Sequence, residues 1–110
     1  MSSVDLRDAY FQIPLSPVSR KYLRFVWQDR VYQFRALCFG LSLAPQVFAR
    51  GFGVVAALLH SLGFRLLRCL DDWLILGESA DSVSRALSHV LSLCDTLGIR
   101  VNVAKSEFTP

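Results

Sequence analysis

Two short apolar stretches, residues 65–70 and 73–76, flank the carboxylate pair Asp71-Asp72. Apolar runs of this length, bounded by turn-forming residues, are typical of β-strands rather than of helices. Asp is common in turns, because its side chain can hydrogen-bond its own backbone, so the pair by itself is also ordinary turn chemistry. The segment therefore predicts a β-hairpin with two carboxylates at its tip, and any fold for this chain has to accommodate that hairpin.

The remaining segments predict further strands and helices around this hairpin. Alternating apolar and polar residues over 1–6 indicate a strand, and residues 8–12 indicate a helical turn that stops before Pro14. Aromatic and β-branched residues indicate a second hairpin, and apolar residues at helical spacing indicate two helices. The further predicted elements are hairpin strands 22–27 and 31–37, helices 45–62 and 83–97, and a last strand over 99–103.

This order predicts an α+β fold in which the helices lie on one face of an antiparallel sheet. A length of 110 residues allows one compact domain, and a hydrophobic fraction of 53% predicts a buried core rather than disorder. The longest weakly polar stretch, residues 51–64, is shorter than the roughly 20 residues that a membrane span requires, so no membrane partner is expected. The three cysteines match neither a zinc pattern nor a disulfide framework, which indicates reduced thiols in an intracellular protein.

The net charge of +3 is compatible with a nucleic-acid partner but is not specific for one. More informative is one segment in which basic and aromatic residues alternate. Such a segment can present a charged face to phosphates, or it can be a solvated hairpin whose aromatic side chains are buried. Both interpretations stay open for Arg20, Lys21, Tyr22, Arg24, Phe25, Trp27, Arg30, Tyr32, Phe34 and Arg35.

Carboxylates occur at two predicted strand ends, at Asp5 and at Asp71-Asp72. Side chains at neighbouring strand ends can converge on one point, and hard carboxylate oxygens are ligands that Mg²⁺ prefers. Two such ions about 3.5–4 Å apart stabilise both the attacking and the leaving oxygen of a phosphoryl transfer. The three aspartates are therefore the candidate catalytic and metal-binding residues.

Four blocks follow one another along the chain: VDLRDAYFQIPL, RALCFGLSLAPQVFAR, CLDDWLILG and LGIRVNVAKSEF. In this order they resemble the conserved blocks of reverse transcriptases. The sequence around the aspartate pair and the Leu-Ser-Leu-Ala-Pro stretch look most similar to retrotransposons of the DIRS type. The resemblance implies an RNA-directed DNA polymerase, a nucleotidyltransferase from a retrotransposon polyprotein.

The resemblance implies a role for each of several residues. Asp5 and Asp71 would bind two Mg²⁺ or Mn²⁺ ions, with Asp72 in support. Tyr10 matches the aromatic residue that blocks the ribose 2′-OH and so selects dNTPs. The alternative is that Tyr10 is an ordinary core aromatic, which is the commoner position of such residues.

Further residues are implied in substrate binding. Asp8 and Ala9 would lie beside the triphosphate, mainly through their backbone N–H groups, and Phe39 and Gly40 would line the nucleotide pocket and the template strand. Lys105 would protonate the departing pyrophosphate. The alternatives are a core position for Phe39 and a solvated charge for Lys105.

The resemblance also implies what surrounds this segment. We expect a single partial domain over residues 1–110, a palm with part of the fingers, without the first fingers strands and the thumb. Its partners would be an RNA or DNA template with a primer, and the isolated chain is not expected to polymerise efficiently. A ribonuclease H in the same polyprotein would lie downstream, because neither Glu78 nor Glu107 is placed like the helical glutamate of that nuclease.

Two departures from the family pattern leave a second hypothesis open. Cys38 stands where the family usually has Pro, and Cys69 stands where it usually has Tyr, a residue that contacts the primer end. The alternative is therefore a non-catalytic retroelement remnant that at most binds nucleic acid. Such binding would depend on salt and would need no divalent metal.

Overall fold

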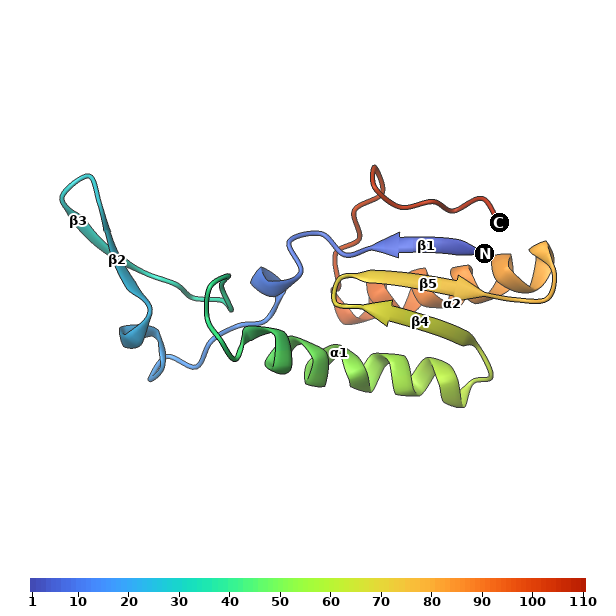
Figure 1. The fold of residues 1–110 in the computed structure, drawn as a ribbon, viewed down its shortest axis with the longest axis horizontal. Coiled ribbons are helices and arrows are strands. Elements are labelled where there is room, and N and C mark those ends of the chain that lie inside the picture. Colours follow the sequence, from blue (N-terminus) through green and yellow to red (C-terminus); the bar gives the residue numbers. More distant parts are fainter.

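The computed structural model describes all 110 residues as an elongated molecule of 55 × 27 × 23 Å (Figure 1). Two regions are visible along its length. A body of three strands and two long helices occupies one end, and a two-stranded arm projects from the other. The elements in chain order are β1 (Ser2–Asp5), η1 (Tyr10–Gln12), η2 (Arg20–Tyr22), β2 (Arg24–Trp27), β3 (Arg30–Gln33), α1 (Ala44–Ser61), β4 (Arg65–Cys69), β5 (Asp72–Leu76) and α2 (Ala80–Leu97).

The sheet of the body has the order β1-β5-β4, and both strand pairs are antiparallel. Side chains alternate between the two faces of a strand, so Val4, its partner Trp73 and the next buried residue of β5, Ile75, share one face. Both helices pack against this face, α1 beside β4 and α2 beside β5 (Figure 1). The expected α+β fold, with helices on one face of an antiparallel sheet, is confirmed.

The helices form where local signals place them. Helix α1 buries a stripe of residues at helical spacing and has Pro45 in its first turn, where a missing N–H costs no hydrogen bond. Helix α2 begins at a capping box between Ser79 and Ser82 and ends at Gly98, which adopts a left-handed φ of 72°. The expected helix positions are confirmed to within a few residues. Neither helix combines the length and apolarity needed to cross a membrane.

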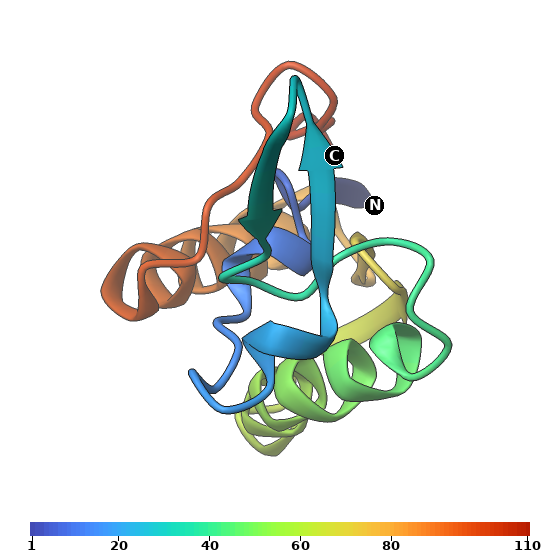
Figure 2. The same cartoon turned by 90° about the vertical axis from the view of Figure 1, so that its left-hand side faces the viewer.

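The arm comprises residues 16–36 and contains β2 and β3. Gln28 and Asp29 have positive φ values of 50° and 61°. Two successive positive φ values are characteristic of the type I′ turn, which joins the two strands of a hairpin through a two-residue loop. Every residue of both strands is exposed, and none of the molecule's buried residues lies between positions 11 and 36. Figure 2 views the molecule from the side of the arm, with the helices behind it. The second hairpin is therefore confirmed, but its aromatic residues are not in a core.

One expected strand is absent. Over residues 99–103 only Val101 forms a bridge, with Leu6, and the segment then turns instead of extending. The N–H of Asn102 donates to the carbonyl of Asp5 at 2.8 Å, and the carbonyl of Asn102 accepts from the N–H groups of Lys105 and Ser106. The prediction of a strand over 99–103 was wrong, because pairing with the chain after β1 is limited to the bridge at Val101 and the turn bonds to the Asn102 carbonyl then end it.

Candidate active site at the β4–β5 turn

The carboxylates meet where β1 ends beside the β4–β5 turn. Asp5 lies directly opposite Asp72 in the antiparallel pairing of β1 and β5. The next N–H, that of Leu6, donates to the carbonyl of Asp71 at 2.9 Å. Only Leu70 and Asp71 form the turn, and Asp72 is the first residue of β5, so the aspartate pair is split between turn and strand. Pairing of the strands thus joins two carboxylate sites that lie far apart in the sequence.

The turn itself has an unusual backbone. Leu70 has a φ of 53°, whereas Asp71 does not have a positive φ, the pattern of a type II′ turn. Glycine usually fills such a position, and a Leu in this conformation costs on the order of 1–3 kcal/mol. The strand pairs on either side hold the turn, because Cys69 is paired with Asp72 directly across it. The backbone that presents Asp71 is therefore fixed by its neighbours rather than by local preference.

The carboxylates also interact electrostatically. Burial raises the pKa of Asp5 above its ordinary value, and a hydrogen bond with the Asp72 carboxyl and the negative charges of Asp72 and Asp71 raise it further. The charge of Lys105 acts in the opposite direction. No group of three His, Cys, Asp or Glu side chains lies close enough together to form a complete set of metal ligands. Among the three aspartates, the carboxyl groups of Asp5 and Asp72 are in direct contact. An excess of negative charge on hard oxygen donors nevertheless fits a divalent cation.

A turn from the end of the chain lies against Asp5. The N–H of Asp5 donates to Oγ of Ser106 at 2.9 Å, and that hydroxyl donates to the carbonyl of Asn102 at 2.8 Å. The N–H of Asn102 also donates to the Asp5 carbonyl. These bonds hold the turn that contains the exposed Lys105 near Asp5, so that the positive charge of Lys105 acts on the Asp5 carboxylate. Asn102 and Ser106 were not identified from the sequence, where the only signal was their position inside the last of the four blocks.

A small cavity of about 60 Å³ lies beside the turn and is lined by Ala9, Tyr10, Phe39, Leu70 and Asp71. Tyr10 is buried, with its ring centroid 4.9 Å from that of Phe39 and 5.3 Å from that of Phe48. Phe39 is 70% exposed, so the alternative of a core position does not hold for it. Tyr10 is both a core aromatic and a cavity wall. Gly40 is exposed and has a φ of 85°, which lets the chain turn immediately after Phe39.

The loop that leads into this cavity has free backbone donors. Asp8 has a φ of 48°, and neither its N–H nor that of Ala9 donates a hydrogen bond within the chain. The side-chain amide of Gln12 braces the loop, because it accepts from the N–H of Arg100 at 2.8 Å and donates to the carbonyl of Arg100 at 3.0 Å. Gln12 was not identified from the sequence, since its partner lies far along the chain.

Comparison with known families gives a match over the whole chain. The family model described as "Reverse transcriptase (RNA-dependent DNA polymerase)" matches residues 1–110. Protein P of a duck hepatitis B virus strain is 31% identical over 112 residues, which cover 98% of this chain and 13% of that protein. The genome polyprotein of Petunia vein clearing virus is 26% identical over 104 residues, or 94% of this chain and 5% of the polyprotein. The chain thus spans a small part of the length of the curated relatives that it matches.

Solved structures give the same fold. The crystal structure of the Prototype Foamy Virus Protease-Reverse Transcriptase matches 96% of this chain and 14% of that chain, with a TM-score of 0.85 and 24% identity. A structure of the foamy viral protease-reverse transcriptase in complex with RNA/DNA hybrid also has a TM-score of 0.85, with 22% identity over 96% of this chain and 14% of that one. The three-stranded sheet, its two helices and the projecting hairpin together are therefore a known arrangement.

Proposed function

The chain belongs to the reverse transcriptase (RNA-dependent DNA polymerase) family, and on this premise we propose that it carries the carboxylates of the polymerase active site. The reaction is the transfer of a nucleotide from a dNTP to a primer 3′-OH. One observation carries the proposal: Asp5 stands opposite Asp72 and next to the backbone of Asp71, where burial, a hydrogen bond with Asp72 and the neighbouring negative charges raise the pKa of Asp5. Such a charge excess is destabilising unless a cation or a proton relieves it.

Asp5 and Asp71 are the proposed ligands of two Mg²⁺ or Mn²⁺ ions, and Asp72 supports them. When bound, such ions lower the pKa of the primer hydroxyl and neutralise the leaving group. The chain's own contribution is position: the β1–β5 pairing holds Asp5, and the strained turn at Leu70 holds Asp71. Charge excess and oxygen donors support this assignment, although all three carboxylates are not gathered into one ligand set.

The cavity beside the turn is the proposed nucleotide site. Tyr10 forms a rigid wall, because it is packed between Phe39 and Phe48, and in this position it would exclude a ribose 2′-OH. The free N–H groups of Asp8 and Ala9 are suited to phosphate oxygens.

Two further residues complete the proposed nucleotide site. Phe39, which is exposed, and Gly40, which follows it, would contact the template strand or the base. Lys105 is the proposed proton donor to pyrophosphate, since it is held close to Asp5.

The proposed setting is a longer polyprotein, because the curated relatives that this chain matches are many times its length. Residues 1–110 would then be a partial domain, a palm with part of the fingers, that depends on other regions to hold the template and primer. Foamy viral protease-reverse transcriptase has been solved with double-stranded DNA and with RNA/DNA hybrid, which supports such partners here. An origin in a retrotransposon of the DIRS type, a ribonuclease H further along the polyprotein and an intracellular location are parts of the same proposal.

A non-catalytic remnant is the second candidate, favoured by the exposed Cys69 at the position of the usual Tyr. The two candidates differ in primer extension by the polyprotein that carries this chain, measured in Mg²⁺ with dNTPs. We expect Asp5→Asn and Asp71→Asn to abolish extension, whereas Asp95→Asn, an exposed position on α2, leaves it unchanged. We expect Tyr10→Ala to admit ribonucleotides. Retained extension in the Asp5 or Asp71 variant would refute the active-site proposal, and no extension by the unaltered protein would support the remnant.

A further inference from the structure

A cleft lies at the open end of the hairpin that carries Asp71 at its tip. Its volume is about 450 Å³, compared with about 60 Å³ for the cavity beside Asp71. The chain enters β4 at one side of the cleft, after Gly63, and leaves β5 at the other, at Gly77, close to the start of α2 (Figure 1). Both strands have five residues, so at about 3.3 Å per residue the cleft lies roughly 16 Å from the β4–β5 turn. It is therefore separate from the carboxylates.

Basic side chains from two elements line this cleft. Arg65 is the first residue of β4, and Arg85 and His89 lie one turn apart on α2, so they share a face of that helix. The guanidinium of Arg85 uses Nε for Asp81 at 3.4 Å, which leaves both Nη groups free, and Arg65 has no carboxylate partner. An anion in the cleft would therefore meet donors that the chain itself does not satisfy.

The ring of His89 is held in one orientation. Its Nδ1 lies 2.9 Å from the carbonyl oxygen of Arg85, and its ring centroid lies 4.9 Å from that of Phe64. A carbonyl oxygen can only accept, so Nδ1 carries the hydrogen and Nε2 is left without a partner in the chain. A nearby anion favours the protonated ring, in which Nε2–H becomes a further donor.

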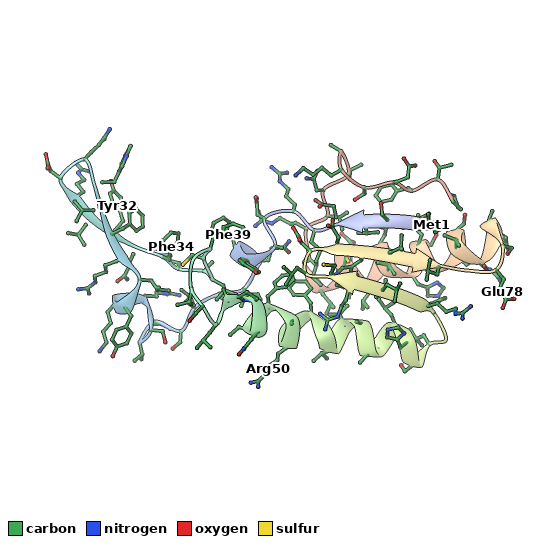
Figure 3. The ribbon with its side chains drawn as sticks, in the orientation of Figure 1. Met1, Tyr32, Phe34, Phe39, Arg50 and Glu78 are labelled. Carbon is green, nitrogen blue, oxygen red and sulfur yellow. The ribbon has the colours of Figure 1, made fainter.

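One carboxylate lines the same cleft. Glu78 follows Gly77 between β5 and α2, and Figure 3 shows it at the end of the body that is farthest from the arm. It forms no ion pair with Arg65 or Arg85, although all three side chains line one cleft. Opposite charges that stay apart across a cleft are complementary to a ligand with an anion at one end and hydroxyl donors at the other.

The start of α2 contributes little to this cleft through its backbone. The capping box joins Ser79 and Ser82 through two hydrogen bonds of 3.1 Å, and the carbonyl of Ser79 accepts from the N–H of Val83. Donors at the helix start are thus bonded within the chain. The charged side chains, rather than the helix terminus, therefore decide which ligand the cleft selects.

We propose that this cleft binds a small phosphate ester of a sugar, with the phosphate on Arg65, Arg85 and His89 and the sugar hydroxyls on Glu78. Guanidinium groups match phosphate oxygens in a bidentate manner, and a carboxylate accepts from hydroxyl donors. A volume of about 450 Å³ lies within the range of small-molecule sites, about 300–1,000 Å³. The site goes beyond the proposed polymerase function, because none of these four residues lies at the aspartates or in the nucleotide cavity.

The test is binding of ribose 5-phosphate to the purified chain in EDTA, measured by the shifts of ¹⁵N-labelled backbone amides in an NMR titration. We expect saturable shifts at residues 63–65, 77–78 and 82–89, and none at residues 5 and 70–72. Shifts that do not saturate, or that are largest at residues 5 and 70–72, would overturn the proposal.

Charge variants locate the phosphate. We expect Arg65→Gln/Arg85→Gln to weaken binding about tenfold or more, since it removes two charge-assisted contacts. The matched control Arg24→Gln/Arg30→Gln removes the same charge from the arm and is expected to weaken binding less than about twofold, because distant surface charges are screened. All four side chains are exposed, and the same spectra show that each variant is folded. Equal weakening by both double variants would reduce the effect to net charge and overturn the proposal.

Matched compounds test the sugar. 2-Deoxyribose 5-phosphate lacks one hydroxyl and is expected to bind at least about fivefold more weakly, a difference that Glu78→Gln removes. Inorganic phosphate is expected to bind about tenfold more weakly than ribose 5-phosphate. AMP distinguishes the two sources of this chemistry: tighter binding than that of ribose 5-phosphate assigns the cleft to a nucleotide, and weaker binding assigns it to a free sugar phosphate. Inorganic phosphate that binds as tightly as ribose 5-phosphate would overturn the proposal.

The active-site variants separate this inference from the proposed function. Asp5→Asn and Asp71→Asn are expected to bind ribose 5-phosphate as the unaltered chain does, because the cleft lies at the other end of the hairpin. Loss of binding in either aspartate variant would place the ligand in the nucleotide cavity and overturn the proposal. Retained binding in a chain that never extends a primer would support the cleft and refute only the catalytic assignment.

Discussion

The body and the arm differ in how far their side chains are buried. The body contains every buried residue of the molecule, including Trp73 and Phe48 at 1% and 0% exposure, whereas residues 11–36 contain none. A two-stranded ribbon without a packed face is at best marginally stable in water. The difference shows that the body can hold the carboxylates in place with its own core, while the arm needs a ligand or a neighbouring segment to cover its aromatic side chains.

This division matches the demands of a catalytic site. A catalytic carboxylate has to be held to within a fraction of an ångström, which strand pairing and a packed core provide. The arm contains none of the three aspartates. The junction between body and arm contains the Tyr10–Phe39 contact, where a buried ring meets an exposed one. Both regions therefore meet at the proposed nucleotide site.

The largest expected contrast is between the two tryptophans. Trp73→Ala removes the largest fully buried side chain, which also packs edge-on against Phe52, and we expect a loss of about 3–5 kcal/mol in the free energy of unfolding. Trp27→Ala, at an exposed position of the arm, is expected to change it by less than about 0.5 kcal/mol. Urea denaturation followed by circular dichroism measures both values. Similar losses for the two variants would mean that the arm shares the core of the body.

A smaller contrast is expected among the cysteines. Burial raises the pKa of the Cys94 thiol to about 11, whereas Cys69 is exposed at the edge strand β4. A thiol-specific reagent at pH 8 is expected to modify Cys69 rapidly and Cys94 only after unfolding, because the thiolate is the reactive form. Reaction of Cys94 as fast as that of Cys69 in the native chain would show that the core of the body is open.

The raised pKa of Cys94 also predicts that the folded state loses stability at alkaline pH. The folded pKa of Cys94 is raised above its unfolded value, so its contribution is fully present below the unfolded pKa near 9 and is lost as the pH rises toward 11. We expect the melting temperature of the body to fall over this range more steeply than that of a Cys94→Ala variant. Equal falls in the melting temperatures of the unaltered chain and the Cys94→Ala variant would contradict a raised pKa for Cys94.

The smallest expected effect is at the carboxylates. Burial, the hydrogen bond with Asp72 and the negative charges of Asp72 and Asp71 raise the pKa of Asp5, whereas Lys105 lowers it, so Asp5→Asn removes a partly buried charge and relieves repulsion in the metal-free chain. We expect a small rise in melting temperature in EDTA at pH 7, measured by calorimetry, with Asp95→Asn as an exposed control that shows none. A lowered melting temperature in Asp5→Asn would mean that the charge stabilises the fold, through Lys105 for example, and that the site has no excess of negative charge.

Local signals were sufficient to predict most of the elements. Pro45, Ser79 and Gly98 lie at helix ends where their backbone preferences act within a few residues, and the two helices are where these residues place them. The hairpins follow in the same way from short apolar or aromatic runs on either side of a turn. The convergence of Asp5 with the Asp71-Asp72 pair could also be expected, since carboxylates at neighbouring strand ends come close together.

The sequence could not show what depends on contacts between distant segments. Residues 99–103 alternate as a strand does, but their pairing is limited to the bridge between Val101 and Leu6, after which bonds to the Asn102 carbonyl turn the chain, and the pattern contains no trace of this limit. Gly77 is a local case that the pattern also did not reveal: a Cβ there would lie 2.8 Å from Cγ2 of Val83, so the entry to α2 leaves no room for a side chain. The exposure of the arm is likewise a property of packing, because alternating aromatic residues look the same whether a core covers them or not.

The most direct test of the central claim, that Asp5, Asp71 and Asp72 form a divalent-metal site separate from the arm, is an NMR titration. Substoichiometric Mn²⁺ is added to the ¹⁵N-labelled chain, and the paramagnetic broadening of each backbone amide is measured. We predict that the signals of Asp5, Leu6 and residues 70–72 disappear first while those of residues 24–33 keep their intensity. Broadening spread evenly over the exposed carboxylates, or absent from residues 5 and 70–72, would contradict the account.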